Sequence, residues 1–339
     1  MICIFQLNLY MSPQGLENSP SRLVDSNKMS STISRPVIAI AGATGHLGRH
    51  VASAFLSPPF NEQFSDVILL SRNETQLEAS KVSGKYTTRK YDEDNPADAL
   101  RGVHILVNTV GPSGHSFKEK LLRALPQTDV QLYFPSEFGV DHYVHDFSHL
   151  EWDAKKRHFA LAQNLIPDRK ICRVFCGLFI EDSIGPWFGF DTTNGRYESV
   201  GSANSPISFT SLEDVGKVVA SLATLAKEKI PDTIHIGGDT RSFLEISEIM
   251  REGGSGRIEV SEIPLQKYKK ETTASSSWDP APYLRLLMGE NKINHSAGAL
   301  GDDNELVNPN GELWKWKNLT DLAGETGGKP WKDFPWPPV

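Results

Sequence analysis

The sequence is poor in cysteine, with three in 339 residues. This number is too small and too odd for a disulfide framework, and Cys172 and Cys176 fall in an apolar, strand-like run that predicts buried thiols. Long apolar runs are also missing, because none approaches the roughly 20 residues that span a bilayer. The start of the chain lacks the basic region and the cleavage site of a signal peptide. These absences predict a cytoplasmic protein with no membrane partner.

Blocks of like charge are missing as well. The 35 basic and 42 acidic residues are mixed along the chain and leave a net charge of −7, so the sequence does not predict direct binding of nucleic acid. With 39% hydrophobic and 23% charged residues, the composition is typical of a globular protein. Residues 1–34 differ, because they are rich in serine and show little periodicity. We expect them to form a disordered N-terminal extension.

Short apolar runs recur along the first half of the chain and alternate with helical patterns. The runs predict buried parallel strands, and the more polar segment 85–92 predicts a strand nearer the sheet edge. The alternation is typical of an α/β fold with a Rossmann-type doubly wound parallel sheet. The predicted strands are 37–41, 67–71, 85–92, 104–110 and 130–135, and the predicted helices are 46–56, 74–81, 96–100 and 117–125.

The rhythm changes after Gly139, where a histidine-rich loop begins. We expect a Rossmann domain over residues 35–180, to which segments around 205–240 return. Residues 181–339 are expected to form mainly a smaller α+β domain and a C-terminal tail. The last third of the chain is expected to be irregular. The later predicted helices are 152–164, 212–226 and 244–251, and the later predicted strands are 171–179 and 233–237.

Three glycines spaced three residues apart separate the first predicted strand from the first predicted helix, in the stretch AGATGHLGR. In such a turn the first glycine adopts backbone angles closed to other residues, the second lets the main chain approach a pyrophosphate, and the third lets the helix pack on the strand. Free N–H groups and the helix dipole then face the phosphates. The strand–turn–helix context predicts a dinucleotide site. Its residues are Gly42, Ala43, Thr44, Gly45, His46, Leu47 and Gly48, spaced GxxGxxG rather than GxGxxG.

A carboxylate is missing at the end of the second predicted strand, where an NAD-specific protein places Asp or Glu on the ribose 2′-hydroxyl. The strand ends instead in Ser71 and Arg72. A guanidinium suits a 2′-phosphate through its forked geometry. Ser71 and Arg72 therefore predict NADP(H) as the cofactor.

Four segments in order, AGATGHLGR, LLSRN, ALRGVHILVNTVGP and YFPSEFGVD, carry a resemblance to a known family. With them the sequence resembles the NmrA-like and isoflavone-reductase-like family of atypical short-chain dehydrogenase/reductases over residues 36–320. The segments FTSLEDVGKVVA and WKWKNLTDLAGETGGKPW resemble its fungal members. The resemblance implies an NADPH-binding domain, a smaller C-terminal substrate domain and a pocket between them.

In the reductases of this family, the helix after PSEFG carries a lysine that acts as general acid/base. Its aromatic-acidic-apolar-Lys pattern matches Trp152 to Lys155, so the resemblance implies Lys155 as the catalytic residue, with Lys156 as the alternative one residue along. A lysine in an apolar pocket exchanges protons near neutrality, because desolvation disfavours its charged form. The run of Lys155, Lys156 and Arg157 is also compatible with a solvated basic face.

The resemblance extends to the rest of the pocket. It implies that Thr109, Val110 and Gly111 line the nicotinamide ribose and that Phe134, Pro135 and Ser136 flank the nicotinamide. It implies a substrate-lining segment at Gly177, Leu178 and Phe179, where plant reductases carry asparagine and phenylalanine. Trp187, in the Gly/Pro-rich loop that follows, either lines a pocket for a flat substrate or belongs to the core, and His142 is a further candidate for the substrate pocket.

Two other patterns suggest different chemistry. The pair Tyr86 and Lys90 matches the YxxxK of short-chain dehydrogenases, but it lies in the predicted third strand, remote from the nicotinamide, and is expected to be a chance match. His142, His145 and His149 have spacings of three and four, which would suit metal ligands on a helix. Because the segment DHYVHDFSH follows a glycine and is predicted to be a loop, we expect a polar lid near the pocket and no metal.

Three functions remain open at this point. The first is an NADPH-dependent reductase that transfers hydride to a small aromatic, phenolic or quinone-like metabolite, with Lys155 moving the proton. The second is a sensor of NADP(H) that binds a protein partner without turnover, and the third is an isomerase or epimerase that uses bound cofactor. Each is compatible with a monomer or a homodimer.

Overall fold

The computed structural model describes residues 35–72 and 84–333. The predicted N-terminal extension, 1–34, and the predicted helix at 74–81 lie outside the described residues. Residues 35–339 form one compact unit of the chain. Within the described ranges, no helix combines the length and the apolar character needed to cross a bilayer.

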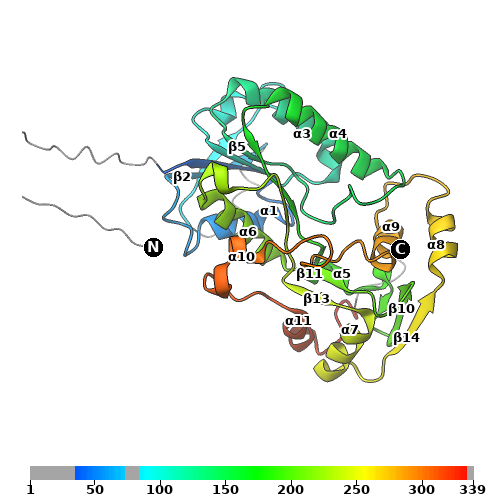
Figure 1. Ribbon diagram of the computed structural model, residues 1–339. Helices are drawn as coiled ribbons and strands as arrows, with labels where there is room; N and C mark the ends of the chain where they lie inside the picture. The colour runs from blue at the N-terminus through cyan, green and yellow to red at the C-terminus, as the bar shows by residue number, and fades with distance from the viewer. Residues whose placement is uncertain (1–34, 73–83, 334–339) are drawn as a thin grey trace, which may run out of the picture. The chain divides into compact units, whose positions relative to one another are not determined.

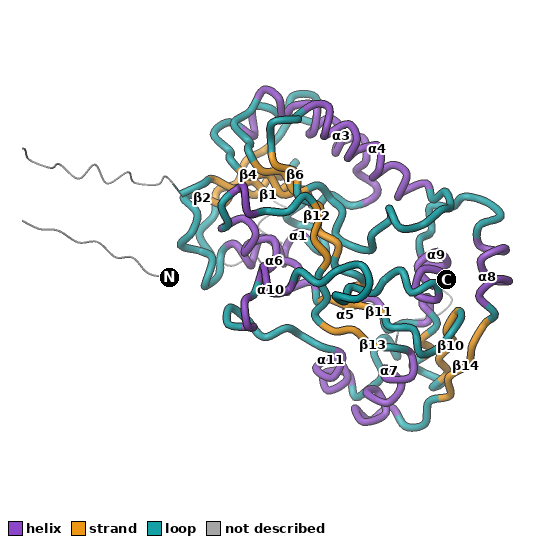
Figure 2. Tube along the Cα trace, viewed as in Figure 1, coloured by secondary structure: helices purple, strands orange, loops and turns teal. Residues whose placement is uncertain are grey.

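Six parallel strands form the central sheet, in the order β3-β2-β1-β4-β5-β6 (Figures 1 and 2). From β1 the chain adds β2 and β3 on one side of the sheet, and it then crosses to the other side of β1 to form β4, β5 and β6. This reversal defines a Rossmann-type doubly wound sheet, and ligands bind in such sheets at the carboxyl ends of the strands flanking the reversal. The predicted α/β fold is thus confirmed. The strands are β1 (Val37–Ala41), β2 (Asp66–Ser71), β3 (Thr87–Lys90), β4 (Ile105–Asn108), β5 (Leu132–Phe134) and β6 (Lys170–Ile171).

Helices cover both faces of this sheet. α1 (Gly48–Phe55) and α6 (Leu212–Thr224) lie on one face, and α3 (His115–Ala124) and α4 (Leu150–Leu165) lie on the other (Figure 1). Because side chains alternate along a strand, Ile38 and Ile40 of β1 pack into the core under α1 and α6, whereas Ala39 and Ala41 pack under α3 and α4. Every side chain of β1 after Val37 is therefore buried, as expected for a central parallel strand.

The remainder of the chain forms three small sheets and a second core. β7 (Arg173–Phe175) pairs with β12 (Thr233–His235), β11 (Ile207–Thr210) lies between β8 (Leu178–Phe179) and β13 (Asp239–Arg241), and β10 (Arg196–Val200) lies between β9 (Phe190–Asp191) and β14 (Glu259–Ile263). Phe190 and Phe243 stack in this core with ring centroids 4.3 Å apart. β7 and β12 pack against the large core, whereas the other two sheets and the helices below surround the second core as a smaller α+β region.

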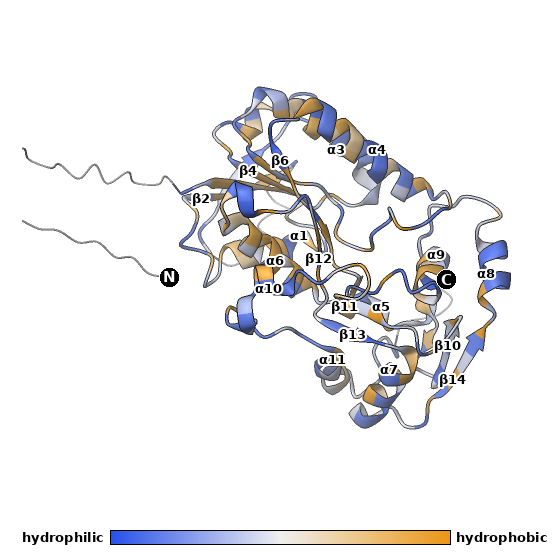
Figure 3. Cartoon of the chain, in the orientation of Figure 1, coloured by the Kyte–Doolittle hydropathy of each residue, from blue (hydrophilic) through white to orange (hydrophobic). Residues whose placement is uncertain are grey.

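Short helices connect and cover these sheets, and in Figure 3 their coloring is mixed, with polar residues on α8. The prediction of an irregular last third is wrong, because this region contains several short helices, of which α7 and α11 begin with capping boxes. Asn318, for example, accepts a hydrogen bond from the Asp321 N–H in a capping box. The helices are α5 (Ile180–Ser183), α7 (Phe243–Met250), α8 (Leu265–Thr272), α9 (Ala281–Gly289), α10 (Asn304–Val307) and α11 (Leu319–Thr326).

The predicted strand at 171–179 is broken into three short strands. Gly177 lies at the second break with φ +66°, and a Cβ there would come within 2.2 Å of the Ser208 carbonyl oxygen. Only glycine fits both the left-handed backbone and this close approach. The chain therefore leaves its pairing with β12 at this point and pairs with β11 instead.

Candidate functional site

The glycine turn between β1 and α1 is built by close backbone contacts. Gly42 has φ +82°, and a Cβ there would lie 2.9 Å from the Thr109 carbonyl carbon. A Cβ on Gly48 would lie 2.0 Å from the Gly42 carbonyl oxygen. The Gly45 N–H donates to that same oxygen at 2.9 Å. Glycine is therefore required at Gly42 and Gly48 for the chain to turn and for α1 to pack against β4.

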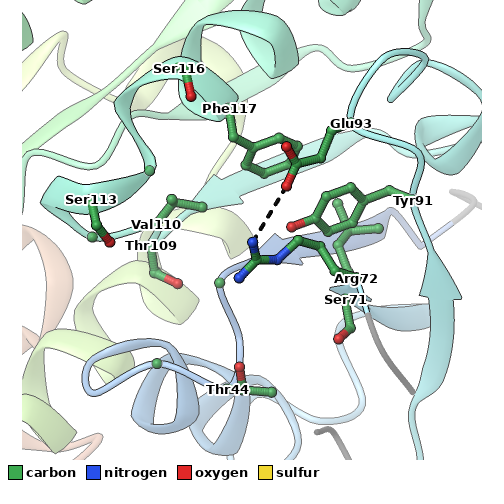
Figure 4. A pocket seen from close by; sticks show the side chains of 15 residues that line it. Thr44, Ser71, Arg72, Tyr91, Glu93, Thr109, Val110, Ser113, Ser116 and Phe117 are labelled. Carbon is green, nitrogen blue, oxygen red and sulfur yellow. Dashed lines mark ion pairs between the residues drawn. The ribbon is translucent and has the colours of Figure 1, made fainter. Parts of the chain in front are cut away.

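A cavity of about 300 Å³ opens beside this turn, at the carboxyl ends of β1, β2 and β4 (Figure 4). Helix α1 begins at the edge of this cavity, and its first turn contains no acidic residue. The positive end of the helix is therefore available to an anionic ligand, because no carboxylate of the helix competes for it. The glycines leave space that a side chain would fill. These features fit the diphosphate of a dinucleotide.

The predicted cofactor residues divide into two groups in this structure. Gly42, Thr44, Gly45, Ser71, Arg72, Thr109, Val110 and Gly111 line the cavity, whereas Ala43, His46, Leu47, Gly48, Phe134, Pro135 and Ser136 do not. Ala43 and Phe134 are core residues, and His46 instead contacts Asp182, with Nε2 2.8 Å from Oδ2. Ser136 donates to the Val110 carbonyl oxygen at 2.8 Å and so holds the rim of the cavity from outside.

Aromatic and acidic residues that sequence reasoning missed complete the wall. Tyr91 and Phe117 stack with ring centroids 4.5 Å apart, and burial raises the pKa of Tyr91. Glu93 lies beside Arg72, with Oε1 3.5 Å from Nη1. All three line the cavity. Their positions in the sequence could have indicated this role, because Tyr91 and Glu93 follow β3 and Phe117 lies near the start of α3. Both segments lie at the carboxyl edge of the sheet, where ligands bind.

Lys155 lies near the same carboxyl edge of the sheet, beside the segment that follows β5. Its Nζ donates to the Glu137 carbonyl oxygen at 3.2 Å and lies 3.9 Å from Oε1 of Glu151, and its side chain is 16% exposed. Glu137 follows Ser136, which is bonded to Val110. The structure thus brings Lys155 next to the ends of β4 and β5, at the predicted nicotinamide end of the site.

Lys156 points elsewhere. Its Nζ lies 4.0 Å from the Asp153 carboxylate and 5.9 Å from the centroid of the Tyr143 ring. Of the two adjacent lysines, Lys155 is the one in contact with PSEFG.

Other titratable groups surround Lys155. Lys118 of α3 is 4% exposed, and burial lowers its pKa to about 8, with a further contribution from the Lys155 charge. Burial lowers the pKa of His115 to about 4, and Lys118 contributes to the same shift. Burial raises the pKa of the Glu137 carboxyl, against the attraction of Lys155. Sequence reasoning missed this cluster, because its members come from three separate segments.

The histidine-rich loop is buried rather than exposed as a polar lid. His145 stacks on Phe147 with ring centroids 4.1 Å apart, and His149 lies 4.3 Å from the Trp152 ring. His142 is 1% exposed and its Nε2 lies 3.3 Å from Oε2 of Glu137. In the described part of the chain, no group of three potential ligands could hold a metal ion. His142 therefore supports the Glu137 segment from within the core instead of lining an open pocket.

The buried histidines should make the protein acid-sensitive. Burial lowers the pKa of His142 from 6.5 to about 2, so below pH 6.5 the unfolded chain binds a proton that the folded protein does not. The free energy of unfolding then falls with decreasing pH, by about 1.4 kcal/mol per pH unit for this group. We expect His142→Gln to flatten the dependence by that amount between pH 6 and pH 4, measured by urea unfolding. Parallel curves for variant and wild type would contradict this assignment.

The predicted substrate residues do not gather at Lys155. Gly177 is packed on Ser208, Leu178 is 4% exposed in the second core, and Phe179 packs partly against the large core. Trp187 lines a different cavity, of about 490 Å³, together with Tyr268 and Arg285. Leu178 is thus a core residue, because its side chain packs among the apolar residues of the second core.

Comparison with known proteins identifies the family. The model of the NmrA-like family matches residues 34–304. The chain belongs to the NmrA-like family. Its relatives include the phenylcoumaran benzylic ether reductase PT1 of Pinus taeda, which is 26% identical over 253 residues, covering 70% of this chain and 81% of that protein.

Solved structures share the fold of this NmrA-like chain. The leucoanthocyanidin reductase of Vitis vinifera with NADPH matches with a TM-score of 0.66 at 16% identity, covering 85% of this chain and 98% of the other. A protein named AtPrR2, with NADP+ and (+)-pinoresinol, matches with a TM-score of 0.69 at 16% identity, covering 86% and 99%. Both were solved with the cofactor type that Ser71 and Arg72 predict here.

Proposed function

We propose that this NmrA-like protein is an NADPH-dependent reductase of the isoflavone-reductase type. The observation that carries the proposal is the position of Lys155, whose ammonium is held by the Glu137 carbonyl at the same sheet edge as the glycine-lined cavity. In this proposal residues 35–180, with the returning segment 205–240, hold the cofactor. Residues 181–339 contribute mainly to substrate binding.

The cavity residues bind and orient the dinucleotide in this proposal. The glycine turn and the start of α1 hold the diphosphate, and Arg72 holds the 2′-phosphate. Thr109, Val110 and Gly111 contact the nicotinamide ribose, with Phe134, Pro135 and Ser136 behind the ring. NADPH, when bound, supplies a hydride.

Lys155 moves the proton that accompanies the reduction. Its ammonium donates a proton to the substrate oxygen on which negative charge develops, and in the reverse direction the neutral amine accepts that proton. The Glu137 carbonyl and the Glu151 carboxylate keep Nζ in place. Lys118 places a second basic side chain near this position.

A small aromatic metabolite, phenolic or quinone-like, is the proposed substrate. The relatives named above include a phenylcoumaran benzylic ether reductase and a protein solved with (+)-pinoresinol, which supports this class.

A titration followed by a substrate panel tests the proposal. NADPH, NADP+, NADH and NAD+ are titrated against the protein, and phenolic, benzylic ether and quinone compounds are then added with NADPH. We expect NADPH to bind more tightly than NADH, and at least one compound to cause loss of NADPH absorbance. Binding of neither reduced cofactor would overturn the proposal.

A sensor of NADP(H) is the second candidate. Its supporting observation is that Gly177 and Leu178 are packed in the core, so the segment that lines the substrate pocket in the reductases offers no open side chain here at those positions. A sensor distinguishes NADP+ from NADPH in affinity and consumes neither. Binding without turnover across the whole panel would favour it.

A further inference from the structure

The cavity holds two opposite charges at the place where the 2′-substituent of the adenosine ribose is expected. In Figure 4 the Arg72 guanidinium points toward the Glu93 carboxylate, with Nη1 3.5 Å from Oε1. Arg72 directly follows β2, and Glu93 lies in the loop that follows β3. The pair therefore joins the ends of two neighbouring parallel strands.

The two side chains suit different dinucleotides. A guanidinium pairs with the 2′-phosphate of NADPH, and a carboxylate accepts from the 2′-hydroxyl of NADH. In an NAD-specific site that carboxylate comes from the end of the second strand. Here that place is taken by Arg72, and the carboxylate comes from the loop after the next strand.

We propose that Glu93 competes with the 2′-phosphate for Arg72 and thereby sets how strongly the protein prefers NADPH over NADH. This inference rests on the dinucleotide site proposed above. Both side chains are accessible, with 67% of Arg72 and 42% of Glu93 exposed, so Arg72 can exchange one anionic partner for another. Binding NADPH replaces the carboxylate with the phosphate, whereas binding NADH leaves the ion pair intact.

The neighbouring acidic residue provides a matched control. Asp94 carries the same charge one residue along, but its carboxylate accepts a hydrogen bond from Lys120 at 2.6 Å and does not line the cavity. The variants Glu93→Gln and Asp94→Asn thus remove the same charge from the same loop. Only the first removes it from Arg72.

Dissociation constants of NADPH and NADH, measured by quenching of tryptophan fluorescence without substrate, test the inference. We expect Glu93→Gln to tighten NADPH about fivefold, the scale of an exposed ion pair, and to leave NADH within about twofold. Asp94→Asn is expected to leave the NADPH/NADH ratio unchanged. The fragments 2′,5′-ADP and 5′-AMP should repeat this contrast, because only the first carries a 2′-phosphate.

A second background separates competition from direct repulsion. In Arg72→Gln, the further change Glu93→Gln should leave the NADPH affinity within about twofold, because no guanidinium remains to be released. A full fivefold gain in that background would overturn competition for Arg72. Circular dichroism of each variant confirms its fold.

The outcomes distinguish this inference from the proposed function. If the wild type binds NADPH and Glu93→Gln leaves the NADPH/NADH ratio unchanged, or weakens NADPH, the inference fails and the proposed function stands. If the wild type binds neither dinucleotide, both fail.

Discussion

Replacing Lys155 with methionine is expected to lower kcat/KM for NADPH-dependent reduction about 100-fold or more, with the NADPH dissociation constant kept within about threefold. Methionine has a side chain of similar length but lacks the ammonium group that donates the proton. Lys155 is bonded to the Glu137 carbonyl and does not line the cofactor cavity. The loss should therefore fall on the chemical step. Turnover is measured with the best compound of the substrate panel, and NADPH binding by fluorescence.

The adjacent lysine provides the control for this experiment. Lys156→Met removes the same group from the same helix, but Lys156 lies beside Asp153 and Tyr143, so its kcat/KM should remain within about threefold of wild type. An equal loss in both variants would indicate a general effect of the basic helix. Unchanged turnover in Lys155→Met would remove Lys155 from the mechanism.

Replacing Gly48 with alanine is expected to destabilise the protein by about 3 kcal/mol and to abolish detectable NADPH binding at micromolar concentration. The new methyl group would lie 2.0 Å from the Gly42 carbonyl oxygen and 2.7 Å from Oγ1 of Thr109. Backbone atoms cannot move aside as a flexible side chain can, so α1 must shift away from β1 and β4. That shift widens the turn that holds the diphosphate.

Gly111→Ala provides the matched control at the same cavity. Gly111 has φ −71°, and a Cβ there meets no atom within 4 Å. The free energy of unfolding of the Gly111→Ala variant should therefore differ from that of wild type by less than about 0.5 kcal/mol. Both variants are compared by urea unfolding. Where Gly48→Ala does not fold, Gly45→Ala replaces it, since its Cβ would lie 3.1 Å from the Gly42 oxygen and cause a smaller loss. Equal stability of Gly48→Ala and wild type would refute the packing argument.

The positions of the strands along the chain and the place of the glycine turn could be predicted because their signals are local. Apolar runs closed by turn residues mark buried parallel strands, and a glycine that must adopt φ +82° at Gly42 leaves its mark in the sequence itself. Helix and strand ends were predicted less well. The helix expected from His46 begins at Gly48, because the residues between belong to the turn.

The substrate segment could not be predicted in the same way. The run around Gly177 looks like one strand, since most of its residues are apolar and strand-forming. Its division depends on the Ser208 carbonyl, which is 31 residues away and approaches Gly177 too closely for any side chain. The burial of His142, His145 and His149 depends likewise on aromatic rings from other elements, which are Phe175, Trp152 and Tyr283.

By itself, the sequence determined a doubly wound sheet, and it predicted a dinucleotide turn at Gly42 and a preference for phosphate at Arg72. Only the tertiary structure decided which of two adjacent lysines contacts PSEFG, and that Glu93 faces Arg72. The physical reason is the range of each interaction. Strand periodicity and glycine geometry act within a few residues of the chain, whereas the Lys155–Glu137 contact and the Arg72–Glu93 pair exist only because separate parallel strands end at one edge of the sheet.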